Sequence, residues 1–114
     1  MANPHESEVT LVLKGVTYKL KLPNRAACDI EHATSKSILE IISALFKGNV
    51  WAAAAFLYGG LLTNHPGISY DQAIDMVPIN DLLPFMKTMF ELVSVSFPTP
   101  EESGDDAAVA ANPQ

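Results

Sequence analysis

The chain has 114 residues, of which 48% are hydrophobic and 18% charged, and its net charge is −6. This length suits one domain with a modest core, and the composition is that of a globular protein rather than a disordered one. The acidic balance argues against nucleic acid and anionic membrane surfaces as partners, because both attract basic proteins. The single cysteine, Cys28, excludes an internal disulfide and a cysteine-based metal cluster.

Residues 1–7 are polar and are expected to be flexible. They have neither the basic nor the apolar stretch of a secretory signal, so a cytoplasmic protein is expected. From Val9 to Leu22, apolar residues alternate with polar ones around Lys14-Gly15, which predicts a β-hairpin. The register set by this turn brings three apolar pairs to one face: Leu13–Val16, Leu11–Tyr18 and Val9–Leu20.

An isolated hairpin is marginal in water, so its apolar face is expected to pack on the helices that follow. Lys19 and Lys21 fall on the opposite face. They form either a solvated face that protects an exposed strand edge or a binding patch, and the first interpretation is favoured.

Asn24 is expected to cap a helix over residues 25–33. Four residues are candidates for its inward face: Ala27, Cys28, Ile30 and Ala33. Cys28 and His32 lie one helical turn apart, but a cysteine nucleophile needs a base that a third group orients in a pocket. A free cysteine is more often a small buried apolar residue, so a structural role is favoured over catalysis.

The motif Ser37-x-x-Glu40 is a capping box that opens a second helix. Apolar residues then recur at helical spacing: Ile38, Ile41, Ile42, Leu45 and Phe46. Gly48 is a natural stop for this helix, and Asn49 is expected to cap the next one.

The stretch Val50–Thr63 carries no charge and contains four consecutive alanines. Its composition predicts a central helix that is buried on nearly all sides. A membrane span is the alternative, but it needs about 20 apolar residues, and Gly59-Gly60 and then Asn64 interrupt this run too early.

A second capping box, Ser69-x-x-Gln72, opens a short helix through Met76. Its expected inward residues are Ile68, Ala73, Ile74 and Val77. Asp81 is a plausible cap for a last helix that runs to about Phe97. That helix carries a wide apolar stripe: Leu82, Leu83, Phe85, Met86, Met89, Phe90, Val93 and Phe97. Such stripes are usually core, but the methionines leave open a face that is half core and half interface.

Residues 98–114 include four acidic residues and no basic or aromatic ones, so a disordered acidic tail is expected. The tail is either a solubilising segment or one that orders on a partner. The predicted fold is therefore α+β and mainly α, with a single domain over residues 8–97 in which an N-terminal hairpin packs on a bundle of about five helices.

Motifs for chemistry are missing from the sequence: it has no phosphate loop, no HExxH, no CxxC and no nucleophile elbow. The three histidines are scattered, and Asp71 and Asp75 fit a solvated helix face. No enzyme activity, cofactor or metal is expected. A small enzyme or ligand-binding domain remains an alternative, but it would need a pocket with convergent polar groups.

Three segments together resemble the small phage tail assembly chaperone family that also occurs in gene transfer agents. They are the hairpin LVLKGVTYKLKL, the block RAACDIEHATSKSILEII, and WAAAAFLYGGLLTNHPGISYDQAIDMV, with its Gly-Leu helix end and His-Pro turn. The resemblance covers roughly residues 9–97. One departure is Ser35, where family members often carry glycine, which affects the first turn between helices.

The resemblance implies a non-enzymatic chaperone of long-tailed phages or prophages. Such a protein binds the tape measure protein, keeps its apolar helices soluble, recruits tail tube subunits, and leaves before the virion is complete. It would work in the host bacterial cytoplasm, without nucleic acid or membrane, and self-association is possible. The expected partner face is on the last helix: Phe85, Met86, Met89, Phe90 and Val93. The unpaired edge of the hairpin is a second candidate, by strand addition. The alternative is a structural tail component, a tube or adaptor subunit that stays in the particle, although tube subunits are mainly β.

Overall fold

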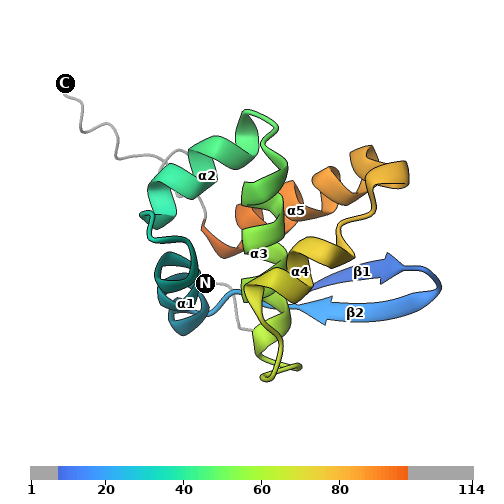
Figure 1. Ribbon diagram of the computed structural model, residues 1–114, viewed down its shortest axis with the longest axis horizontal. Coiled ribbons are helices and arrows are strands. Elements are labelled where there is room, and N and C mark those ends of the chain that lie inside the picture. The colour runs from blue at the N-terminus through green and yellow to red at the C-terminus, as the bar shows by residue number, and fades with distance from the viewer. Residues whose placement is uncertain (1–7, 98–114) are drawn as a thin grey trace.

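A computed structural model describes residues 8–97 of the chain, and it has the expected α+β, mainly α architecture (Figure 1). Its elements in chain order are β1 (Val9–Leu13), β2 (Val16–Leu20), α1 (Asn24–Thr34), α2 (Ile38–Phe46), α3 (Val50–Leu62), α4 (Tyr70–Met76), the 3-10 turn η2 (Ile79–Asp81) and α5 (Leu82–Ser96). The hairpin followed by five helices confirms the predicted fold. The expectations for residues 1–7 and 98–114 concern positions outside the described part of the chain.

The hairpin has the predicted register, with Leu13 opposite Val16, Leu11 opposite Tyr18 and Val9 opposite Leu20. Lys14 and Gly15 form its turn with φ values of 51° and 79°, as a two-residue turn between twisted strands requires. On β1 the apolar face is buried as far as Leu13 at the tip, whereas on β2 Val16, next to the turn, is 49% exposed. The hairpin therefore extends beyond the helices that cover it (Figure 1).

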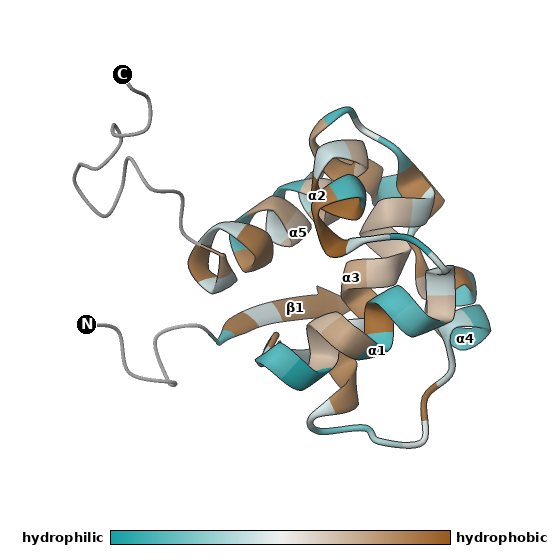
Figure 2. Ribbon diagram, turned by 90° about the vertical axis from the view of Figure 1, so that its left-hand side faces the viewer, coloured by the Kyte–Doolittle hydropathy of each residue, from teal (hydrophilic) through white to brown (hydrophobic). Residues whose placement is uncertain are grey.

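Helix α3 lies at the centre of the domain and contacts β2, α1, α2, α4 and α5. Its residues from Ala52 to Leu57 are all buried, as are Gly59, Gly60 and Leu61. Figure 2 shows this apolar helix enclosed among the others. The prediction of a central helix buried on nearly all sides is therefore confirmed. None of the helices in residues 8–97 combines the length and apolar character needed to cross a membrane.

The helix caps agree only in part with the capping residues predicted from the sequence. Ser69 and Gln72 form the full reciprocal box, while Ser37 accepts a hydrogen bond from the Glu40 amide at 3.1 Å without the return contact. Asn24 is the first residue of α1 rather than its cap, which is Pro23. Asn49 and Asp81 occupy cap positions, but neither side chain caps its helix. The Asn49 side chain donates to the Ala44 carbonyl instead.

The inward faces of the short helices are narrower than the sequence predicts. In α1 the buried residues are Ala26 and Ile30, which lie four positions apart on one face, so Cys28 and Ala33 point to solvent. In α2 and α4, Phe46 and Ile74 were expected inside but are 54% and 43% exposed. Each of these helices contacts α3 along a single stripe, which leaves the flanking apolar positions uncovered.

Replacing Ser35 with glycine is expected to raise the free energy of unfolding by about 0.5–1 kcal/mol. Ser35 ends α1 in the left-handed conformation, with φ 59° and ψ 32°, and its amide donates to the Glu31 carbonyl at 2.8 Å. Glycine adopts this conformation without a Cβ penalty. Urea unfolding of both proteins measures the difference. Ser35→Ala keeps the Cβ and is the control, and an equal gain from alanine would contradict this explanation.

Candidate functional site

The structure places most of the predicted partner face of α5 in the core. Phe85, Met86, Met89 and Val93 are between 0% and 6% exposed. Phe90 is half-buried, with its ring stacked on Phe46 of α2 at 5.4 Å between ring centroids. The stripe is wide because α5 packs on β1, α2 and α3 at once. Phe85, Met86, Met89 and Val93 are therefore assigned to the core, and a partner surface must be sought elsewhere.

The residues considered for chemistry do not come together. Cys28 and His32 are both exposed on α1, and Asp71 and Asp75 are exposed on α4. Within residues 8–97, no group of three or more His, Cys, Asp or Glu side chains is placed to hold a metal ion.

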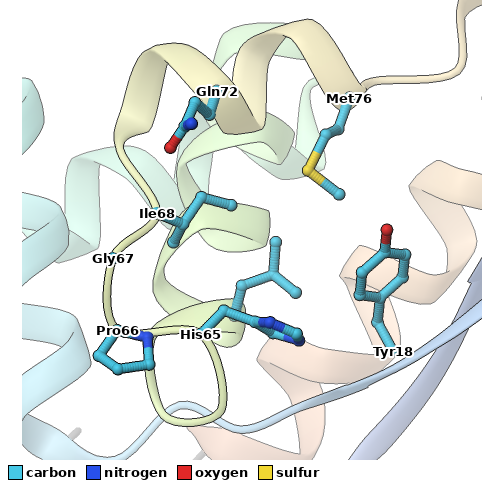
Figure 3. Close-up of a pocket in the computed structure, with 8 residues that line it drawn as sticks. Tyr18, His65, Pro66, Gly67, Ile68, Gln72 and Met76 are labelled. Carbon is cyan, nitrogen blue, oxygen red and sulfur yellow. The ribbon is translucent and has the colours of Figure 1, made fainter.

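A concave surface lies between the hairpin and the α3–α4 connection (Figure 3). It has a volume of about 560 Å³ and is lined by Tyr18, Leu61, His65, Pro66, Gly67, Ile68, Gln72 and Met76. A second hollow of about 190 Å³ shares Tyr18 and Met76 with it and continues to Leu13, Lys14 and Pro78. A third hollow, of about 390 Å³, shares Leu13, Lys14 and Pro78 with the second one and extends to η2. We call the mainly apolar surface made up of these three neighbouring hollows the hairpin groove.

Local hydrogen bonds hold the loop of the hairpin groove against β2. The Asn64 side-chain amide donates to the Lys19 carbonyl at 3.1 Å, and the Lys21 amide donates to the Gly60 carbonyl at 3.0 Å. The residue after Asn64 is His65, whose backbone amide donates to the Leu61 carbonyl at 2.7 Å. Its ring then meets the Tyr18 ring edge-to-face, with centroids 5.7 Å apart. One wall of the groove is thus fixed by the end of α3.

The opposite wall comes from α4, whose Gln72 and Met76 lie one turn apart. Met76 points toward Tyr18, while the Gln72 side chain is turned away from Tyr18 (Figure 3). The Gln72 carbonyl oxygen accepts from the Ser69 amide at 2.8 Å, so the cap of α4 also fixes this side chain. The Tyr18 phenol, the His65 imidazole and the Gln72 amide are the polar groups of an otherwise apolar lining. A surface of this kind suits the binding of apolar side chains with a few polar contacts.

Tyr70 anchors α4 to α3 and thereby sets the width of the groove. Its hydroxyl donates to the Trp51 carbonyl at 3.2 Å, and its ring packs edge-to-face on Tyr58 at 6.0 Å. Burial raises the pKa of Tyr70 above its ordinary value of 10.0, and the nearby Asp71 carboxylate raises it further.

Because the folded state disfavours the phenolate, Tyr70 contributes stability below pH 10 that is lost as the pH rises through its raised pKa. Tyr70→Phe should lower the free energy of unfolding by about 1 kcal/mol near neutral pH, through loss of one hydrogen bond. The difference between the two proteins should shrink toward zero in alkaline solution. Urea unfolding between about pH 8 and 11 tests this, and a pH-independent difference would contradict it.

Sequence reasoning did not find the hairpin groove, because its walls come from three separate segments. Tyr18 was placed correctly on the apolar face of the hairpin, and His65 was assigned to a turn. No residue pattern indicated that the two rings would meet. The one usable signal was the length of the hairpin, whose apolar face reaches Val16, beyond the cover that the helices provide.

Comparison of the chain with models of protein families, with curated proteins and with solved structures finds no match.

Proposed function

We propose that this chain is a tail assembly chaperone that binds the tape measure protein and helps to recruit tail tube subunits. In this proposal it acts in the bacterial cytoplasm during tail assembly and is absent from the finished particle. The chaperone has no catalytic step: it covers apolar helix surface of the tape measure protein until the tube forms around it.

The hairpin groove is the observation that carries this proposal, because it is an apolar surface open to a partner. The order of the elements also supports it. The hairpin, the Ser37-capped α2, the end of α3 after Gly59-Gly60 and the box-capped α4 follow the three segments that resemble the chaperone family. An amphipathic helix could place apolar side chains in the groove, as in other helix-in-groove complexes.

Co-expression with the tape measure protein of the same genome, followed by affinity purification, tests the proposal. Mass spectrometry of finished particles should accompany it. Co-purification together with absence from particles is the expected result. If finished particles contain stoichiometric amounts of this protein, the alternative function, a structural tube or adaptor subunit, is favoured over the chaperone function. The single two-stranded sheet within residues 8–97 favours the chaperone over a mainly β tube subunit.

Two variants of α4 test whether the hairpin groove is the binding surface. Met76→Glu places a charge in the groove and should reduce capture of the tape measure protein at least tenfold. Ile74→Glu changes the same helix at an exposed position outside the groove and should leave capture unchanged. Circular dichroism of both variants checks that they fold. Equal capture by the two folded variants would show that the partner binds another surface.

A further inference from the structure

Basic residues gather on the hairpin and its exit. Between Val9 and Cys28 the sequence holds no acidic residue and four basic ones: Lys14, Lys19, Lys21 and Arg25. Within residues 8–97 the only ion pair joins Lys36 to Glu40 at 3.8 Å. Within this part, no acidic side chain forms an ion pair with Lys14, Lys19, Lys21 or Arg25.

The complementary charge lies in the C-terminal part of the sequence, which is outside the described residues. Residues 101–106 read Glu-Glu-Ser-Gly-Asp-Asp, and no basic residue occurs from 98 to 114. This acidic stretch starts four positions after Phe97, the residue that follows α5. Helix α5 packs on β1, and it ends on the side of the molecule where β1 begins (Figure 2). The chain therefore leaves the described part at Phe97, on the same side of the domain as the base of the hairpin.

The lengths of the two charged segments also agree. From Lys21 to the turn at Gly15 the strand covers six residue steps, or about 20 Å at about 3.3 Å per step. The six residues 101–106 span about the same length when extended. The segment is therefore long enough to reach from Lys21, past Lys19, to Lys14 at the turn.

We propose that residues 101–106 bind along β2 of the same chain, with their carboxylates against Lys14, Lys19 and Lys21. Each exposed ion pair of this kind is weak. A short tether, however, gives the segment an effective concentration in the millimolar range, at which several weak pairs together suffice. Since Lys14 also lines the hairpin groove, the bound segment reaches the rim of that groove at Lys14.

Amide NMR spectra of the full-length chain test this contact without any partner. The test variant neutralises the segment: Glu101→Gln, Glu102→Gln, Asp105→Asn and Asp106→Asn. At about 0.02 M salt, the amide shifts of residues 14–21 should differ between wild type and this variant. At about 0.5 M salt, screening should make the two spectra coincide over these residues.

A second variant with the same change in net charge is the control: Glu40→Gln, Asp71→Asn, Asp75→Asn and Glu91→Gln. All four residues are exposed on helices, and their replacement should leave the shifts of residues 14–21 as in wild type. The proposal is overturned if the control shifts these amides as strongly as the test variant, or if the test variant and wild type agree at low salt.

Cys28 allows an independent check of the same contact, because it is the only cysteine, is exposed, and lies one turn from Arg25. A spin label on Cys28 should weaken the amide signals of residues 101–106 at low salt and much less at high salt. A mixture of spin-labelled copies without isotope and isotope-labelled copies without spin label reports only contacts between chains. Comparing it with copies that carry both labels separates these from contacts within one chain. Weakening that occurs only between copies would overturn binding within the same chain.

Discussion

Replacing Gly59 with alanine should lower the free energy of unfolding by about 2 kcal/mol, although alanine is the better helix former. A Cβ at this position of α3 would lie 2.7 Å from Ile30 Cγ1 and 3.1 Å from Leu22 Cδ2, with Ile30 Cδ1 closer still. Ile30 is fully buried and has no room to move. Overpacking therefore outweighs the helix-propensity gain of about 1 kcal/mol. Urea unfolding followed by circular dichroism measures the loss.

Gly60 provides the matched comparison for this prediction. A Cβ there would be 3.1 Å from Leu20 Cβ and Leu92 Cδ2, which calls for a smaller adjustment, so Gly60→Ala should cost less than Gly59→Ala. Ile30→Ala removes the atoms that the new Cβ meets. The Gly59→Ala/Ile30→Ala double variant should therefore be more stable than the sum of the two single effects implies, by about 1 kcal/mol or more. Strict additivity would show that the contact with Ile30 is not the cause.

Replacing Met89 with glutamate should cost more than about 4 kcal/mol and leave much of the protein unfolded at room temperature. Met89 is completely buried, and a carboxylate placed there would lose its hydration without gaining a basic partner. Loss of the helical circular dichroism signal, or a large fall in the urea midpoint, measures the effect.

Leu83→Glu is the control on the same helix, because Leu83 is 75% exposed and its replacement should change stability by less than about 0.5 kcal/mol. A Met89→Glu protein as stable as wild type would mean that this side of α5 is a surface after all. Because Met86 and Met89 are both buried, glutamates at these positions would unfold the domain and cannot serve to test partner binding.

Local patterns predicted most of the fold correctly. The alternation around Lys14-Gly15 determined the hairpin and its register, since a shift by one residue would turn every apolar side chain to solvent. The uncharged composition of α3 predicted its central place, and the Ser69–Gln72 box predicted the start of α4. In each case, neighbouring residues contain all the information that the structural feature requires.

The candidate binding surface could not be predicted in the same way. Periodicity in α5 reveals an apolar face, but not whether Met86 and Met89 meet this chain or another one. The hairpin groove exists because Tyr18 and Met76, 58 positions apart in the sequence, border the same cavity. Such a juxtaposition depends on how helices pack, and packing is decided by side-chain shape across the whole core.

The central position of α3 has a consequence for hydrogen exchange. Since this helix contacts β2 and each of the other four helices, none of them can keep its core contacts once α3 unfolds. The amides of α3 should therefore exchange with solvent only through global unfolding. The tip of the hairpin, where Val16 is half exposed, can open alone and should exchange orders of magnitude faster. The domain would then behave as one cooperative unit with a single locally mobile arm, and that arm forms one side of the hairpin groove.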